Sequence, residues 1–134
     1  MRASADFGRL VLRLALGTLV LLHGIAKLID GPGFITGLVS NAGLPAFLAY
    51  GVYLGEVVGP VLVILGLWTR AGALLIVANM VVALVLVHAG QLLDLNAQGG
   101  WELELQGMYL SAALAVALLG AGRFGITGAN GRWN

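Results

Sequence analysis

The sequence has no cysteine and very few charged residues. Its 134 residues include seven Lys or Arg and six Asp or Glu, whereas 60% of the chain is hydrophobic. The absence of cysteine excludes disulfides, thiolate redox chemistry, and zinc or iron–sulfur sites with cysteine ligands. So few charges cannot cover a soluble domain of this size, because small domains expose a large part of their surface. We therefore expect a chain embedded in the lipid bilayer, and a net charge of +1 gives no indication of nucleic-acid binding.

Four long apolar runs predict four membrane-spanning helices. Each is about 20 residues long, the length that a hydrocarbon layer of ~30 Å requires. Turn-forming residues separate the runs, among them Gly31-Pro32-Gly33 and a two-residue turn at Thr69-Arg70. The expected fold class is all-α: a transmembrane four-helix bundle that forms a single domain over residues 1–134. Its spans cover about 10–29, 45–68, 71–91 and 102–121.

The positions of the basic residues predict the orientation of this bundle. If both termini are cytoplasmic, six of the seven basic residues lie on the cytoplasmic side and Lys27 alone lies on the other. This is the bias that the positive-inside rule describes. The segment Phe34–Asn41 is too short to span the bilayer, so we expect it to form a short interfacial helix or a re-entrant segment between the first two spans.

Polar residues that are costly in a membrane fall mainly in the half of the bundle away from the termini. His23 and Lys27 are four residues apart, on one helix face. Glu56 lies about 11 residues into the second span, near the bilayer midplane, where the carboxylate must be protonated, paired or hydrated. Beside it, Gly51-xxx-Gly55-xxx-Gly59 predicts a close approach of a neighbouring helix. His88, Trp101 and Glu102 also belong to this half, with Glu104 close by at the start of the fourth span, and together the set predicts a polar cavity in the outer half.

This cluster can be interpreted as a binding site or as a structural network. A quinone requires a hydrogen-bond donor at its carbonyl oxygen and a proton source, and histidine and a carboxylate can supply both. The same residues could instead form a structural Lys27–Glu56 ion pair. Glu56 and His23 are the catalytic candidates, and the ligand-binding candidates are His23, Lys27, Glu56, His88, Trp101 and Glu102.

Two further interpretations concern the histidines and the tryptophans. His23 and His88 would permit a haem, or a metal site with a nearby glutamate, but no spacing such as HExxH is present, so we expect no metal site. Trp68 and Trp101 stand at the edges of predicted spans, and Trp133 lies in the segment that follows the last span. We interpret all three as anchors at the membrane surface, where tryptophan is enriched.

In their order and spacing, the polar residues and turns described above together resemble those of the DoxX family of small bacterial membrane proteins. The family takes its name from a membrane subunit associated with quinol oxidase and thiosulfate:quinone oxidoreductase activity. The resemblance therefore implies an oxidoreductase component of the bacterial inner membrane with access to quinone. The residues that carry the resemblance are Arg13, His23-Gly24, Lys27, Glu56, Thr69-Arg70, His88, Gly100-Trp101-Glu102 and Arg123.

Three functions fit the sequence. The first is a membrane component of a redox system that binds a quinone or a similar small apolar ligand. Its electrons would come from a partner oxidoreductase subunit, because the chain has no evident cofactor motif of its own. The second is a non-catalytic membrane anchor or assembly subunit. The third is a small carrier or proton path, which four short helices without visible repeats would form only as a homo-oligomer. Whether the chain is itself an enzyme stays open.

Overall fold

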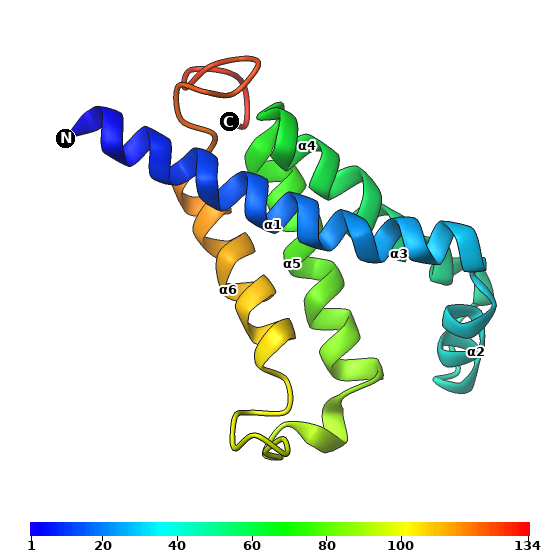
Figure 1. Ribbon diagram of the computed structural model, residues 1–134. Helices are drawn as coiled ribbons and strands as arrows, with labels where there is room; N and C mark the ends of the chain where they lie inside the picture. The colour runs from blue at the N-terminus through cyan, green and yellow to red at the C-terminus, as the bar shows by residue number, and fades with distance from the viewer.

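The computed structural model describes residues 1–134, and its regular structure is helical (Figure 1). The main helices are α1 (Arg2–Asp30), α2 (Gly33–Asn41), α5 (Thr69–Leu86) and α6 (Glu104–Leu119). Between α2 and α5, an unbroken helical stretch consists of the 3-10 helix η1 (Ala46–Tyr50), α3 (Gly51–Tyr53), the π-helix η2 (Leu54–Val58) and α4 (Gly59–Leu65). A short 3-10 helix, η3 (Ala89–Gln91), follows α5. The all-α prediction is confirmed.

Three helical segments are long and apolar enough to cross a membrane, namely Arg2–Asp30, Ala46–Leu65 and Thr69–Leu86. The fourth apolar helix, α6, has 16 residues and is therefore about 24 Å long, somewhat less than a full hydrocarbon layer. It packs along α5, whereas α1 lies across this pair in Figure 1. Both termini lie toward the end of the molecule where α4 meets α5, and α2 lies far from them.

Several helix ends differ from the predicted span boundaries. Thr69 and Arg70 form the first turn of α5 instead of a separate turn, because the chain reverses earlier, at Gly66 to Trp68. Gly66 ends α4 in the left-handed conformation, with φ of 69°, which glycine adopts without steric cost. At the other end, α5 stops at Leu86, so His88 lies beyond the helix. The predicted short helix between the first two spans is present as α2.

The core lies between α1, α4, α5 and α6. Its buried side chains are Leu16, Val20, Val63, Ala73, Ile76, Met80, Ala113 and Val116. Glycine allows the close helix contacts: a Cβ built on Gly59 would come within 2.8 Å of the Gly72 carbonyl oxygen, and one on Gly55 would collide with the Asn79 side chain. Gly51 has no neighbour within 4 Å. The glycine ridge expected from the sequence therefore packs at two of its three positions.

Arginine side chains close the helix ends at the end of the molecule that holds the termini. Arg13 is 1% exposed, and its guanidinium donates hydrogen bonds to the carbonyl oxygens of Val63, Ile64 and Ala121 at 2.9–3.0 Å. Arg70 likewise donates to the carbonyl oxygens of Ala117 and Leu118 at the end of α6. The last carbonyl groups of a helix have no partner within it, so these contacts stabilise α4 and α6.

Candidate functional site

A partly buried ion pair joins α1 to the π-helix η2. Lys27 Nζ lies 2.6 Å from each carboxylate oxygen of Glu56. Asn79 Nδ2, from α5, donates a third hydrogen bond to Glu56 Oε1 at 3.0 Å. The Glu56 side chain is only 6% exposed, whereas that of Lys27 is 32% exposed. The sequence required this carboxylate to be protonated, paired or hydrated, and in the structure it is paired.

The backbone around Glu56 is irregular for identifiable reasons. Pro60 follows four residues later and has no N–H, so it cannot donate the α-helical hydrogen bond to the Glu56 carbonyl oxygen. The chain winds as a π-helix at this point, a rare conformation that is frequent at functional sites. Gly24 of α1 lies directly against the same carbonyl, since any Cβ at position 24 would collide with it. Lys27 is one helical turn further along α1, which places its ammonium group at the Glu56 carboxylate.

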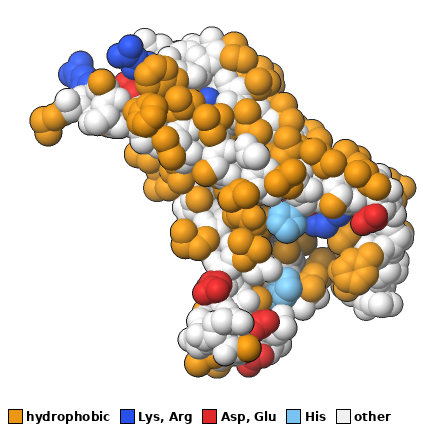
Figure 2. Space-filling view, viewed as in Figure 1, with side chains coloured by type: hydrophobic (Ala, Val, Ile, Leu, Met, Phe, Trp, Pro, Cys, Tyr) orange, Lys and Arg blue, Asp and Glu red, His pale blue; other side chains and the backbone are white.

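A cavity of about 530 Å³ lies beside this ion pair. Its walls come from α2, the helical stretch Ala46–Leu65 and α5, and 15 of its 21 lining residues are hydrophobic. Its polar lining consists of a few groups that include Lys27, Glu56, Asn79 and His88. Figure 2 shows basic and histidine side chains at the border of a hollow in this part of the molecule. Volume and lining are those of a small-molecule site, in which a few polar groups orient an otherwise apolar ligand.

The structure brings three of the six predicted site residues to this cavity: Lys27, Glu56 and His88. His88 Nδ1 lies 2.8 Å from Gln91 Oε1, which leaves the other ring nitrogen free of that contact. His23 is exposed and lies outside the cavity lining. Its ring meets the Tyr109 ring edge to face, with centroids 5.9 Å apart, so it is directed toward α6.

Trp101 and Glu102 lie in the loop before α6, also outside the cavity lining. Trp101 Nε1 donates to the Leu92 carbonyl oxygen at 2.8 Å, and its ring packs over Gly107. Glu102 is exposed and does not pair with Lys27, whose carboxylate partner is Glu56. No group of three His, Asp or Glu side chains is arranged to hold one metal ion together.

Two contributors to the site were missing from the sequence-based candidates. Asn79 holds the Glu56 carboxylate, and the Tyr53 hydroxyl donates to the Lys27 carbonyl oxygen at 3.2 Å. A signal for Asn79 does exist, because it is the one amide in the interior of the third predicted span, whereas the other amide, Gln91, stands at the end of that span. Such a residue in a membrane helix usually bonds to a neighbouring helix. Tyr53 gives no comparable signal, since tyrosine is common at the ends of membrane helices.

The geometry describes a small helical membrane protein with a partly buried ion pair at the wall of an apolar cavity. The chain belongs to the DoxX family, whose model matches residues 8–89, a range that contains every polar residue named above for the cavity. A Bacillus subtilis relative, "Putative oxidoreductase CatD", is 32% identical over 111 residues, covering 83% of this chain and 82% of the relative. A Haemophilus influenzae relative named "Uncharacterized protein" is 36% identical over 114 residues, covering 83% and 81%. No solved structure matches this chain.

Proposed function

We propose that the protein is a membrane component of a redox system that binds a quinone, or a similar small apolar ligand, in the cavity beside Lys27 and Glu56. The observation that carries this proposal is the combination of a cavity of about 530 Å³ and a charged, hydrogen-bonded group at its wall. A purely structural ion pair would not require a cavity next to it. The name of the Bacillus subtilis relative supports the redox part of the proposal.

The polar groups at the cavity fit the needs of a quinone head group. A bound quinone supplies two-electron, two-proton chemistry. Lys27 Nζ has three N–H donors, of which two point to Glu56, so one remains for a carbonyl oxygen of the ligand. Asn79 Nδ2 likewise retains a second N–H. The Lys27 ammonium group holds a proton that it could pass to a ligand oxygen, either directly or through Glu56 across the 2.6 Å hydrogen bond, so the pair could supply one of the two protons that quinone reduction requires and the second would come from water.

The apolar walls fit the remainder of such a ligand. Leu38, Leu48 and Val82 belong to α2, η1 and α5 respectively, and each lines the cavity. A ligand between these elements would be shielded from water, and its tail would lie against side chains as apolar as lipid. The electrons would be delivered by a partner oxidoreductase, since this chain has no cysteine and no evident cofactor motif.

We also propose that the chain crosses the bacterial inner membrane four times, with both termini in the cytoplasm. Both termini lie toward one end of the molecule in Figure 1, as an even number of spans requires. Most of the basic residues belong to that end, which agrees with the positive-inside rule. In this arrangement α6 is the fourth span, and it reaches both surfaces with the help of the residues flanking it, such as Trp101.

The test is mass spectrometry of the small molecules that the protein retains in native-lipid discs. The wild type is compared with Val82→Trp, which fills the cavity from α5, and with Val81→Trp, a matched control. Val81 is the adjacent exposed residue and does not line the cavity. We expect quinone to be enriched over bulk lipid in the wild type and in Val81→Trp, and to be lost in Val82→Trp.

A third variant, Glu56→Gln, separates the head-group contacts from the apolar cavity. Glutamine keeps the size of the side chain and removes its charge. We expect quinone retention to fall in this variant, provided that gel filtration shows the same folded, monodisperse protein. If no quinone is enriched in the wild type, or if all variants retain it equally, the proposed ligand site is wrong. The ion pair would then be a structural element of a membrane anchor or assembly subunit.

A further inference from the structure

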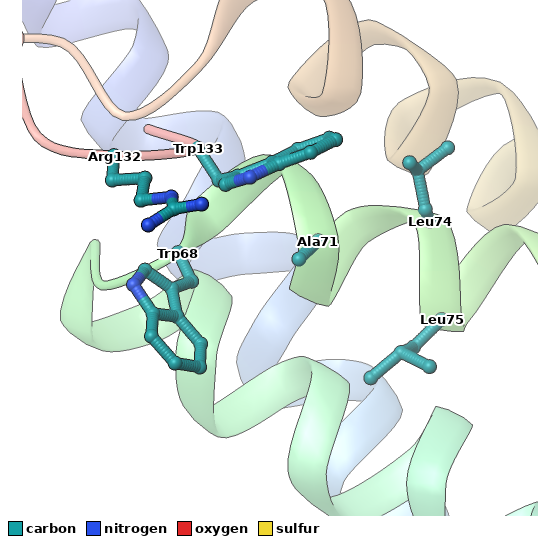
Figure 3. A pocket seen from close by; sticks show the side chains of 6 residues that line it. All are labelled: Trp68, Ala71, Leu74, Leu75, Arg132 and Trp133. Carbon is teal, nitrogen blue, oxygen red and sulfur yellow. The ribbon is translucent and has the colours of Figure 1, made fainter.

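A second cavity, of about 550 Å³, lies at the other end of the molecule, where α4 turns into α5 (Figure 3). Its lining comes from the turn, the first two turns of α5 and the C-terminal segment. Figure 3 shows Arg132 beside two indole rings at one end, with Leu74 and Leu75 toward the other. The lining residues are Trp68, Ala71, Leu74, Leu75, Arg132 and Trp133.

The two tryptophans are held in place by an unusual backbone. Trp68 and Trp133 have φ of 47° and 59°, and they are the only non-glycine residues with positive φ. Such conformations persist only where the surroundings fix them, and they are enriched at binding sites. Here the C-terminal segment is tied to the turn: the Arg70 N–H donates to the Trp133 carbonyl oxygen at 2.8 Å, and the Thr69 N–H donates to Asn134 Oδ1 at 3.1 Å.

Arg132 is the only charged group of this cavity, and it is exposed and forms no hydrogen bond or ion pair within the protein. Asp6 is the one acidic residue in the first turns of α1, and it is paired with Arg9 and not with Arg132. The guanidinium group is therefore available for an external anion. Its planar fork suits the oxygens of a phosphate group, which it can bind through two parallel hydrogen bonds.

We infer that this cavity binds one anionic phospholipid, with the phosphate at Arg132, the glycerol region at the two indoles, and an acyl chain along Leu74 and Leu75. The order of groups in the cavity matches the order of groups in such a lipid. Tryptophan is enriched at the depth of the lipid head groups, and basic pockets between membrane helices bind anionic head groups. The site is separate from the cavity beside Lys27, since the two share only Leu75 among their lining residues.

The test is native mass spectrometry of the protein released from discs that contain equal amounts of phosphatidylcholine and phosphatidylglycerol. We expect the wild type to retain one phosphatidylglycerol molecule in preference to phosphatidylcholine. Arg132→Gln should lower this preference about tenfold, the effect of losing one charge-assisted contact. The matched control is Arg123→Gln, because Arg123 stacks on Phe124 at 5.1 Å, outside this cavity. This control should retain the wild-type preference.

Two further measurements distinguish a lipid site from a site for free phosphate. Glycerol phosphate carries the same phosphate chemistry without acyl chains, so it should fail to displace the bound lipid. In a Trp101→Phe background, Trp68 and Trp133 are the only indoles, and brominated phosphatidylglycerol should quench their fluorescence more than brominated phosphatidylcholine does. Any one of four results would overturn the inference. Two concern retention: the wild type retains both lipids equally, or Arg132→Gln keeps the wild-type preference for phosphatidylglycerol. The other two are equal quenching by the two brominated lipids and full displacement of the lipid by glycerol phosphate.

Discussion

Lys27 Nζ lies at equal distances of 2.6 Å from the two carboxylate oxygens of Glu56, so one side chain of α1 holds both oxygens of a residue in η2. The two partners differ in exposure: the Glu56 side chain is almost fully buried, whereas about one third of the Lys27 side chain is exposed. Lys27 could therefore move toward water if its partner were removed, because its long apolar stem allows the ammonium group to reach a polar surface. Glu56 has no such freedom.

This difference predicts unequal effects of removing either partner. Lys27→Met leaves a buried carboxylate with Asn79 as its one remaining partner, and we expect it to lower the free energy of unfolding by about 3 kcal/mol, the lower end for a broken buried pair. Glu56→Gln leaves an ammonium group that can reach water, so its effect should be smaller. Thermal unfolding in one detergent, followed by circular dichroism, measures both.

The double variant Lys27→Met/Glu56→Gln supplies the control for this prediction. It contains no uncompensated charge, so its destabilisation should be smaller than the sum of the two single effects. If the single effects simply add, the two side chains do not act as a pair in the folded protein, and the predicted coupling is wrong.

The contact between α1 and η2 depends on the lack of a side chain at position 24. A Cβ at Gly24 would collide with the Glu56 carbonyl oxygen, which belongs to the backbone and cannot swing away. We expect Gly24→Ala to destabilise the protein by about 1–3 kcal/mol, the usual cost of overpacking. Gly8→Ala is the matched control on the same helix, because nothing lies within 4 Å of a Cβ there. That variant should be neutral or slightly more stable, since alanine favours a helix over glycine. Equal unfolding temperatures for the two variants would contradict the predicted contact.

Much of this site follows from the sequence, and the physical reasons are clear. Glu56 lies in the middle of an apolar run, where an ionised carboxylate requires a partner, and Lys27 is the one basic residue away from the arginine-rich end. Charge and depth together therefore made this ion pair one of the two interpretations that the sequence allowed, and the structure contains it. The close packing of Gly55 and Gly59 followed from their four-residue spacing, which places them on one helix face.

Other features could not be predicted because they depend on the relative rotation and order of the helices. The four-residue spacing places His23 and Lys27 on nearly the same face of α1, but that face is broad enough to contact two different helical segments. His23 meets Tyr109 of α6, whereas Lys27 meets Glu56 of η2. The cavity itself lies between α5 and α2, which packs on η1, and no sequence pattern states where α2 lies relative to α5. Likewise, the shorter α5 removes His88 from the helix while leaving it at the cavity wall.

Arg13 is predicted to be essential for stability without contributing to ligand binding. It is buried and donates three hydrogen bonds to carbonyl oxygens of two different segments, and it is not part of the lining of either described cavity. Arg13→Met would leave these carbonyl groups unpaired, which we expect to lower the free energy of unfolding by at least about 3 kcal/mol. Arg2→Met, at an exposed position of the same helix, should leave the unfolding temperature unchanged. Wild-type stability of Arg13→Met would contradict the structural role.

The last prediction concerns Asn79, whose amide is the second donor to Glu56. Asn79→Leu keeps the approximate size of the side chain and removes one hydrogen bond to a charged group, at a cost of about 1.5–3 kcal/mol. Asn79→Asp removes the same donor and adds a second carboxylate beside Glu56, and like charges at this distance repel each other. Asn79→Asp should therefore be the less stable variant, although aspartate is closer to asparagine in shape. Thermal unfolding of the two purified variants measures the order. If the leucine variant unfolds first, packing against Gly55, and not the charge of Glu56, determines which side chain position 79 accepts.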